Sequence, residues 1–503
     1  MRMTLTSEWP WHIFSLLAGC LLTLAFAPFE LGYLALVVTG FAYFSWKDVT
    51  PGRAFRRGYL FGLGLFGSGV SWVYVSIHDY GGSTVFGALL LTGAFVCFWA
   101  LFPALTAWLF NHLTQKIALP VLVSLIFAIV WIIIEYFRGE WLLNGFPWLQ
   151  VGYSQLDGPL AGFVPVFGSY GVGGLLLLSA GLLVEIISDM RKQSLLLGFL
   201  LFIWISGVVL RQFDWTHEAA RPLTVSLIQG NIPQDKKWQS DVRVKTLRRY
   251  RELTQQHAES DLIIWPETAI PAYQSQVEDF YLQPLAEWAK QNQLTLVAGV
   301  PDRNPKTGQN YNKLIVLGEN SGAYNKNHLL PFGEYLPLQP LSGWILDALG
   351  LHLGQFSPGG RLQPLIQVKG YPFASSICYE DAFAAVFLPT LPAATFLVNI
   401  TNDAWFGHSI EAQQHMQIAR ARALETGRYL LRVTNTGITG IVAPNGKIIA
   451  QLPAFKEAVL TQDFTPRTGM TPFAGIGNEK IMVALALILG VVIGIPRLRR
   501  AKA

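Results

Sequence analysis

Ser375-Ser376-Ile377-Cys378-Tyr379-Glu380-Asp381 is the stretch that decides the fold, because a short apolar run ends there in a thiol and two carboxylates. Two comparable stretches precede it: Ile264-Trp265-Pro266-Glu267 and Tyr324-Asn325-Lys326-Asn327-His328-Leu329. Each places one reactive group at the edge of a predicted strand, namely a carboxylate, an ammonium group and a thiol. A base, a cation and a nucleophile together suit attack on a carbonyl carbon.

Around these motifs, short β-branched runs alternate with polar stretches of helical spacing. The predicted strands are residues 223–229, 261–265, 294–300, 313–317, 365–368, 374–377, 395–400, 430–434 and 438–443. The predicted helices are residues 241–259, 276–291 and 411–426. Such alternation predicts a layered α/β domain whose functional groups lie at strand ends.

The rest of the chain has the composition of a membrane protein. Of 503 residues, 51% are hydrophobic and only 14% are charged, and the modest net charge of +5 gathers near segment ends, which is no nucleic-acid footprint. Apolar runs predict about eight spans: residues 11–28, 31–46, 58–77, 85–110, 117–137, 160–188, 194–210 and 481–496. We expect a membrane domain at 1–210 with about seven transmembrane helices, a catalytic domain at 211–480, and a last span with a basic tail at 481–503.

Positive residues predict how these spans are oriented. One set of segment ends holds Arg2, Lys47, Arg53, Arg56, Arg57, Lys116, Arg191, Lys192, Arg497, Arg499, Arg500 and Lys502. The short loops on the other side hold little beyond Arg138. The positive-inside rule therefore places the N-terminus in the cytoplasm and residues 211–480 outside it.

Cys378 is the one cysteine of three that lies outside the predicted spans, since Cys20 and Cys97 lie within them. No even set remains for disulfides in the exported region. A free cysteine is most often a small buried hydrophobe. Here the flanking motifs favour a reactive thiol instead.

The three motifs resemble the signatures of the nitrilase (carbon–nitrogen hydrolase) superfamily, in the same order. Further strings are similar to bacterial apolipoprotein N-acyltransferases: Gln229-Gly230-Asn231-Ile232-Pro233-Gln234, His328-Leu329-Leu330-Pro331-Phe332-Gly333-Glu334-Tyr335, Thr401-Asn402-Asp403-Ala404-Trp405-Phe406-Gly407, Gly69-Val70-Ser71-Trp72-Val73-Tyr74 and Gly145-Phe146-Pro147-Trp148. The likeness extends over essentially the whole chain. It implies an αββα nitrilase-like sandwich on the periplasmic side of the bacterial inner membrane, attached to an α-helical transmembrane bundle.

The resemblance also implies an activity. An acyl chain would pass from a phospholipid, through a thioester on Cys378, to the α-amino group of the N-terminal diacylglyceryl-cysteine of a lipoprotein. Glu267 would be the general base and Lys326 the oxyanion stabiliser, with no metal or other cofactor. The partners would be a phospholipid donor, a diacylglyceryl-apolipoprotein acceptor and the membrane, with no nucleic acid.

Two other classes stay open on the residues alone. A membrane-tethered nitrilase-type amidase would keep the same three residues and attack a C–N bond in a soluble substrate, but one helix would suffice to anchor it. A transporter with a regulatory exported domain is the non-enzyme alternative, although no paired intramembrane charges mark a transport path.

Four further residues are implied as parts of the site. Glu334 would orient Lys326 or the base, while Glu380, Tyr379 and Trp238 would line the site without an assigned step. Structural hydrogen bonding is the alternative for both glutamates.

Residues 338–355 form a strongly apolar stretch directly after Glu334, with Trp344 and Leu346 near its centre. It is too apolar for an ordinary exposed loop and too short to span a membrane. We expect a lid that dips into lipid and guides acyl chains to Cys378. Ordinary packing against the domain is the alternative.

Overall fold

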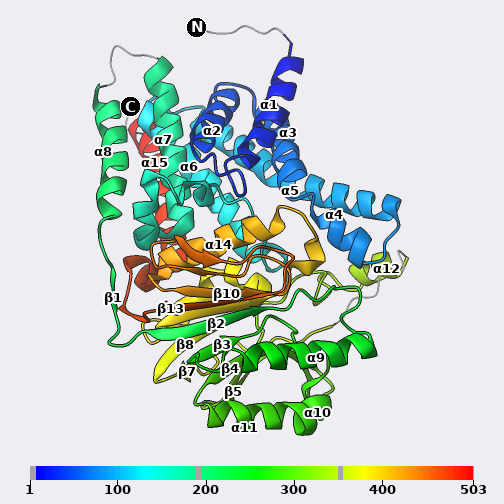
Figure 1. Ribbon diagram of the computed structural model, residues 1–503. Helices are drawn as coiled ribbons and strands as arrows, with labels where there is room; N and C mark the ends of the chain where they lie inside the picture. The colour runs from blue at the N-terminus through cyan, green and yellow to red at the C-terminus, as the bar shows by residue number, and fades with distance from the viewer. Residues whose placement is uncertain (1–6, 189–193, 349–354, 502–503) are drawn as a thin grey trace. The chain divides into compact units, whose positions relative to one another are not determined.

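The computed structural model describes residues 7–188, 194–348 and 355–501 (Figure 1). The chain divides into two compact units. The first consists of Met1–Tyr74, Val85–Phe213 and Ile476–Ala503, and the second of Val75–Thr84 and Asp214–Gly475.

The first unit is built from apolar helices, and each of the eight predicted runs overlaps one. They are α1 (Trp9–Thr23), α2 (Tyr33–Trp46), α3 (Pro51–Gly69), α5 (Val85–Thr114), α6 (Pro120–Tyr136), α7 (Val164–Ser188), α8 (Ser194–Leu210) and α15 (Pro472–Ala501). With the short turns that continue α6 and precede α7, four of them are long and apolar enough to cross a membrane: Val85–Thr114, Pro120–Asn144, Pro159–Ser188 and Pro472–Gly494.

The predicted count of about eight spans is therefore confirmed only in part. A fifth span results if α3 and the bent segment Val73–Tyr80, which meet at 59°, are counted as one. The helices α1, α2 and α8 have 15, 14 and 17 residues. At 1.5 Å per residue, α1 is about 22 Å long, which is less than the hydrocarbon core of about 30 Å.

Small residues let two helices of this unit approach closely. A Cβ atom on Gly19 of α1 would lie 2.0 Å from the carbonyl oxygen of Phe61, and one on Gly64 of α3 would lie 2.1 Å from that of Leu16. Each glycine thus faces the backbone of the other helix. This close contact is the type that holds helices together in lipid, where burial of apolar surface gives little driving force.

The second unit contains two six-stranded sheets. One has the order β13 (Ala458–Phe464), β2 (Leu223–Gln229), β3 (Leu262–Ile264), β4 (Thr295–Arg303), β5 (Asn310–Gly318) and β6 (Gly322–Asn325). The other has the order β12 (Ile448–Gln451), β11 (Gly440–Val442), β10 (Leu430–Thr434), β9 (Phe396–Thr401), β8 (Tyr371–Ile377) and β7 (Ile366–Val368). The central triplets β2–β3–β4 and β8–β9–β10 are parallel, so the ends of neighbouring strands lie at one edge.

Alternating side chains bury the two faces of each sheet. Leu227 of β2 belongs to the core between the sheets, together with Phe373 of β8 and Ile400 of β9. The next residue, Ile228, points the other way and packs with Leu247 of α9 (Ser240–Gln255). This arrangement explains why the central strands are apolar on both faces.

Helices cover the outer faces of both sheets, which gives four layers in the order αββα (Figure 1). The first sheet is covered by α9, α10 (Gln274–Val277) and α11 (Gln283–Gln291), and the second by α13 (Ala384–Phe387) and α14 (Glu411–Thr426). The predicted α/β sandwich is confirmed.

Several elements differ from the prediction. The strand 430–434 and the helix 411–426 have the predicted bounds, but the predicted helix 276–291 is interrupted by a turn of π-helix at Glu278–Leu282. The strands β1 (Thr216–Glu218), β6, β12, β13 and β14 (Arg467–Gly469) were not predicted. In β13, buried and exposed residues follow one another without a clear alternation.

One short segment between two apolar helices belongs with the sandwich. Val75–Thr84 follows α3 in the chain yet is part of the second unit. Its Tyr80 ring packs edge-on against Trp405, which lies in the turn Asp403–Phe406, with centroids 6.1 Å apart.

Candidate active site

Glu267 follows the end of β3, where the sheet pairing stops. The Trp265 N–H still donates to Val297 of β4 at 2.8 Å, but Pro266 has no N–H to continue the ladder. A Cβ atom on Gly299 of β4 would lie 2.7 Å from the Glu267 Cα atom and 2.5 Å from the Thr268 nitrogen. Only a glycine lets β4 lie this close to the turn that carries Glu267.

The Glu267 carboxyl is buried, with 8% of the residue exposed. Asn312 of β5 donates to its Oε1 at 2.6 Å. Burial raises the pKa of Glu267, the nearby Glu334 raises it further, and Lys326, Asn312 and Lys237 oppose the rise. The direction is the one expected for a base in an apolar surround.

Lys326 directly follows β6 and is almost completely buried. Its Nζ lies 2.8 Å from Oε2 of Glu334. Glu334 also accepts from Leu330 N at 2.8 Å and from Asn312 Nδ2 at 3.1 Å. Burial alone would lower the pKa of Lys326, but Glu334, Cys378 and Glu267 raise it overall, so the group is an ammonium ion. Asn312, which the sequence analysis missed, joins the two glutamates.

Cys378 lies at the sharp end of β8, where its φ of 53° falls in the left-handed region. A non-glycine residue with this backbone conformation is strained and persists only where its surroundings hold it. A short 3-10 helix, Cys378–Ala382, begins at the same residue. The turn places Cys378 at the strand end, where the residue is partly exposed.

Glu380 holds that turn to the one that carries Lys326. It is completely buried and accepts from Ile377 N at 2.8 Å, Asn327 N at 2.8 Å and His328 N at 2.9 Å, and from the Tyr324 hydroxyl at 2.9 Å. Burial raises the pKa of Glu380 to about 7, although Lys326 and the three backbone N–H groups lower it. The contacts favour the structural alternative for this residue.

The charges of Glu267 and Lys326 both act on the Cys378 thiol. Burial and Glu267 raise its pKa to about 12, while Lys326, His415 and a hydrogen bond with Thr401 lower it. Lys326 thus acts in the expected direction but does not prevail. The resting Cys378 side chain is therefore a neutral thiol, which becomes a thiolate when a base takes its proton.

The other candidates differ in position. Tyr379 is buried, and its ring lies edge-on to Phe383 with centroids 5.1 Å apart. Trp238 lies on the loop between β2 and α9 and is 54% exposed. Trp344 of α12 (Leu341–Ala348) is 69% exposed. Leu346 lies in the same helix, but its side chain falls outside the described residues, as do residues 349–354.

A buried charged network lies beside the Cys378 turn and was not predicted. Asp381 accepts from Arg432 at 2.9 Å and lies 2.7 Å from the His415 ring. Arg432 also donates to Asn399 at 2.8 Å and to Asp403 at 3.1 Å. Asn399 in turn donates to the Cys378 carbonyl at 3.1 Å. In the sequence, the one sign of this network was Arg432, a charged residue within the apolar run of β10.

Part of this network has the spacing of metal ligands. Asp403, Glu411 and His415 offer atoms that lie within 4.8 Å of one another. Burial and Arg432 lower the pKa of His415, but Asp381 and Asp403 raise it overall. His415 and Arg432 together pair with three carboxylates, those of Asp381, Asp403 and Glu411. A protonated His415 has no free ring nitrogen to offer a metal ion, which argues against one here.

Comparison with known proteins decides the family. Residues 18–182 match the apolipoprotein N-acyltransferase N-terminal domain, and residues 224–471 match the carbon–nitrogen hydrolase domain. The apolipoprotein N-acyltransferase of Methylococcus capsulatus is 45% identical over 480 residues, with 95% of each chain covered. The one of Azotobacter vinelandii is 41% identical, with 94% of this chain and 93% of its own covered. This chain belongs to the apolipoprotein N-acyltransferase family.

Membership in the apolipoprotein N-acyltransferase family favours the acyltransferase interpretation over the tethered amidase. Among solved structures, Nit3 of Saccharomyces cerevisiae is 19% identical with a TM-score of 0.37, covering 49% of this chain and 91% of its own. A carbon–nitrogen hydrolase from Helicobacter pylori is 15% identical with a TM-score of 0.36, covering 48% and 88%.

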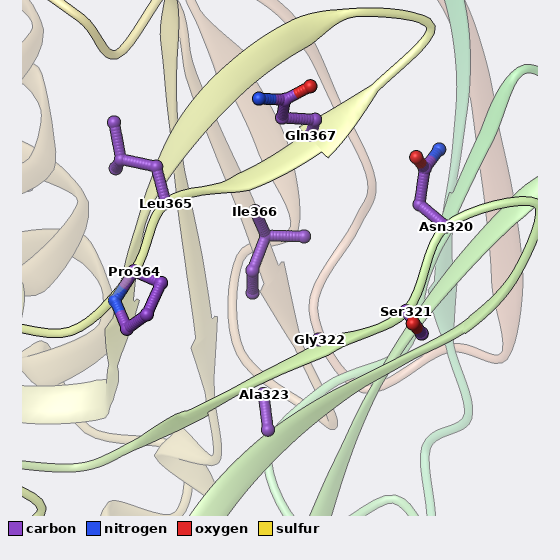
Figure 2. Close-up of a pocket in the computed structure, with 8 residues that line it drawn as sticks. All are labelled: Asn320, Ser321, Gly322, Ala323, Pro364, Leu365, Ile366 and Gln367. Atoms are coloured by element: carbon purple, nitrogen blue, oxygen red, sulfur yellow. The ribbon is translucent and has the colours of Figure 1, made fainter.

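A separate cavity of about 330 Å³ lies elsewhere in the second unit. It is lined by the turn and start of β6 on one side and by the segment entering β7 on the other: Asn320, Ser321, Gly322, Ala323, Pro364, Leu365, Ile366 and Gln367. Figure 2 shows Ile366 between the two segments. The lining includes neither Glu267 nor Cys378.

Proposed function

We propose that this chain moves an acyl chain from a phospholipid to the α-amino group of the N-terminal diacylglyceryl-cysteine of a lipoprotein, through a thioester on Cys378. One observation supports this most. A buried carboxylate, a buried ammonium ion and a partly exposed cysteine on a strained turn each follow the end of a strand, and the charges of Glu267 and Lys326 act on the Cys378 thiol.

In the first half-reaction, the Cys378 sulfur attacks the carbonyl carbon of the phospholipid ester. The S–C bond forms as the thiol proton passes to Glu267, whose raised pKa suits it as acceptor. The Lys326 ammonium ion, fixed by Glu334, stabilises the oxyanion. The C–O bond then breaks, and Glu267 returns the proton to the departing lysophospholipid.

In the second half-reaction, the lipoprotein amine attacks the thioester carbon. The N–C bond forms, and the amine proton passes to Glu267. The C–S bond breaks, and the Cys378 thiolate takes the proton back from Glu267. This ping-pong cycle restores the enzyme and needs no metal, nucleotide or redox partner.

We place residues 1–210 and 481–503 in the bacterial inner membrane and residues 211–480 on its periplasmic side. The long apolar helices and the clusters of Lys and Arg at alternate span ends support this arrangement. Of those charges, Arg2, Arg191, Lys192 and Lys502 lie outside the described residues.

Exposed apolar side chains around α12 support the proposed lid. Leu338 is 63%, Leu341 57% and Trp344 69% exposed. Apolar side chains this exposed mark a surface that contacts lipid or a partner. We propose that they enter the lipid and guide acyl chains towards the site. Trp238 would line the site itself.

Intact mass measurement tests the proposed function. Purified protein incubated with phospholipid alone should gain the mass of one acyl chain, and hydroxylamine should remove it, because a thioester is cleaved by this nucleophile. Cys378→Ala should never gain the mass, whereas Cys20→Ala/Cys97→Ala should gain it normally. Acyl mass on the Cys378→Ala protein would refute the thioester.

A further inference from the structure

One of two adjacent lysines in the loop before α9 is turned into the protein. Lys237 is 2% exposed, whereas its neighbour Lys236 is exposed. The Lys237 Nζ donates to the backbone carbonyl of Glu267 at 3.4 Å. Lysine is seldom buried so completely unless a negative charge compensates for its lost hydration.

The charges of the buried site show what that compensation is. Glu267 and Glu334 supply two negative charges, and Lys326 is held by Glu334 in a 2.8 Å ion pair. The groups that act on Glu267 are Lys326, Lys237, Glu334 and the Asn312 amide, and Glu267 acts in turn on the Cys378 thiol. Without Lys237, two buried carboxylates would share a single lysine, which favours protonation of one of them.

We propose that Lys237 is a positioning residue for Glu267: its ammonium group supplies the second buried positive charge that keeps the Glu267 carboxylate ionised and able to take the thiol proton. The same group holds the Glu267 carbonyl just before Thr268, whose φ is 50°. This inference rests on the proposed role of Glu267 as the base.

The protonation of Lys237 itself agrees with this role. Burial lowers the pKa of Lys237 to about 8, and the Glu267 charge opposes the shift. The ammonium form therefore predominates below that pH. Protonation of Glu267 would limit the reaction at acid pH, where Lys237 carries its charge.

The pH dependence of acyl-enzyme formation, followed by intact mass with phospholipid in detergent, tests the inference on the full-length protein. In Lys237→Met, the acid limb of the pH–rate profile should move up by about one pH unit. The rate on that limb should then be about tenfold lower than in the wild type, and the two rates should become equal at higher pH. Lys237→Gln should show the same shift, because it keeps a donor but loses the charge. Lys237→Arg should move the limb less, and Lys236→Met should not move it.

Two outcomes would overturn the inference. One is an unshifted limb in folded Lys237→Met or Lys237→Gln protein, with folding checked by gel filtration and thermal midpoint. The other is an equal loss of rate at every pH, which a purely structural role would give.

Glu267→Gln, measured in the same series, separates this inference from the proposed function. If Glu267→Gln acylates at the wild-type rate, the base assignment itself is wrong and the inference falls with it. If Glu267→Gln is inactive while the neutral Lys237 variants leave the limb in place, only the role of Lys237 is refuted.

Discussion

Replacing Glu334 with glutamine tests whether its ion pair with Lys326 aims the ammonium group. Through Oε2, Glu334 accepts from Lys326 Nζ and Leu330 N, both at 2.8 Å, and through Oε1 it accepts from Asn312 Nδ2 at 3.1 Å. Glutamine has one acceptor oxygen and one NH₂ group. Whichever way it turns, the NH₂ group faces at least one donor, so the arrangement cannot be kept intact.

The size of the effect follows from what the ammonium group loses. Lys326 is 1% exposed, so water cannot replace its partner. Removing one member of a buried pair typically costs about 3–5 kcal/mol, and loss of one oxyanion donor costs about 10²–10³-fold in rate. We expect acyl-enzyme formation to slow by about 10²-fold in Glu334→Gln and by about 10²–10³-fold in Lys326→Met.

Single-turnover acylation measured by intact mass is the assay, with a phospholipid and a short-chain activated ester as donors. Both donors should slow equally, because both form the same oxyanion. The double variant Glu334→Gln/Lys326→Met should be no slower than Lys326→Met, since Glu334 acts through Lys326. Glu319→Gln is the control, because that carboxylate pairs with Lys369 away from the site at 2.6 Å. Losses that multiply in the folded double variant would refute the reasoning.

Three further outcomes are expected. Glu267→Gln should slow acylation by about 10²–10⁴-fold. Because burial raises the pKa of Glu267, the wild-type rate should fall as the pH drops through a value above the pKa of an exposed glutamate. A pH-independent rate would contradict this. Arg432→Met leaves Asp381 and Asp403 buried without their guanidinium partner, so the free energy of unfolding should fall by about 3–5 kcal/mol, measured as a lower thermal midpoint. The control Arg248→Met, at an exposed residue, should change it by less than about 0.5 kcal/mol. Trp344→Asp should keep its activity with a short-chain water-soluble ester and lose it with bilayer phospholipid; equal losses in folded protein would show that α12 supports the site and is no lipid lid.

Local patterns sufficed for much of the sandwich, because strand and helix periodicity are encoded within a few residues. The apolar run of β10 and the polar-to-apolar spacing of α14 both gave their observed bounds. Pairing across the chain is not encoded locally. The strand β13 joins the first sheet beside β2, more than 200 residues earlier in the chain, and its seven residues lack a clear alternation of their own. The number of spans depends on helix length, which hydropathy windows overestimated for α1 and α2.

The sequence by itself marked the ends of two of these strands: Glu267 and Cys378 each follow a short apolar run whose end is marked locally. Lys326 was singled out by its motif, but the strand before it was not predicted. Their proposed roles remain predictions. Only the tertiary structure decided how these groups are held and charged. Asn312 bridges two glutamates and Glu380 ties two turns together, and these partners lie far apart in the chain. Burial, which no local pattern records, then raises the pKa of Glu267 and of the Cys378 thiol, and it leaves charges such as Lys326 dependent on their partners.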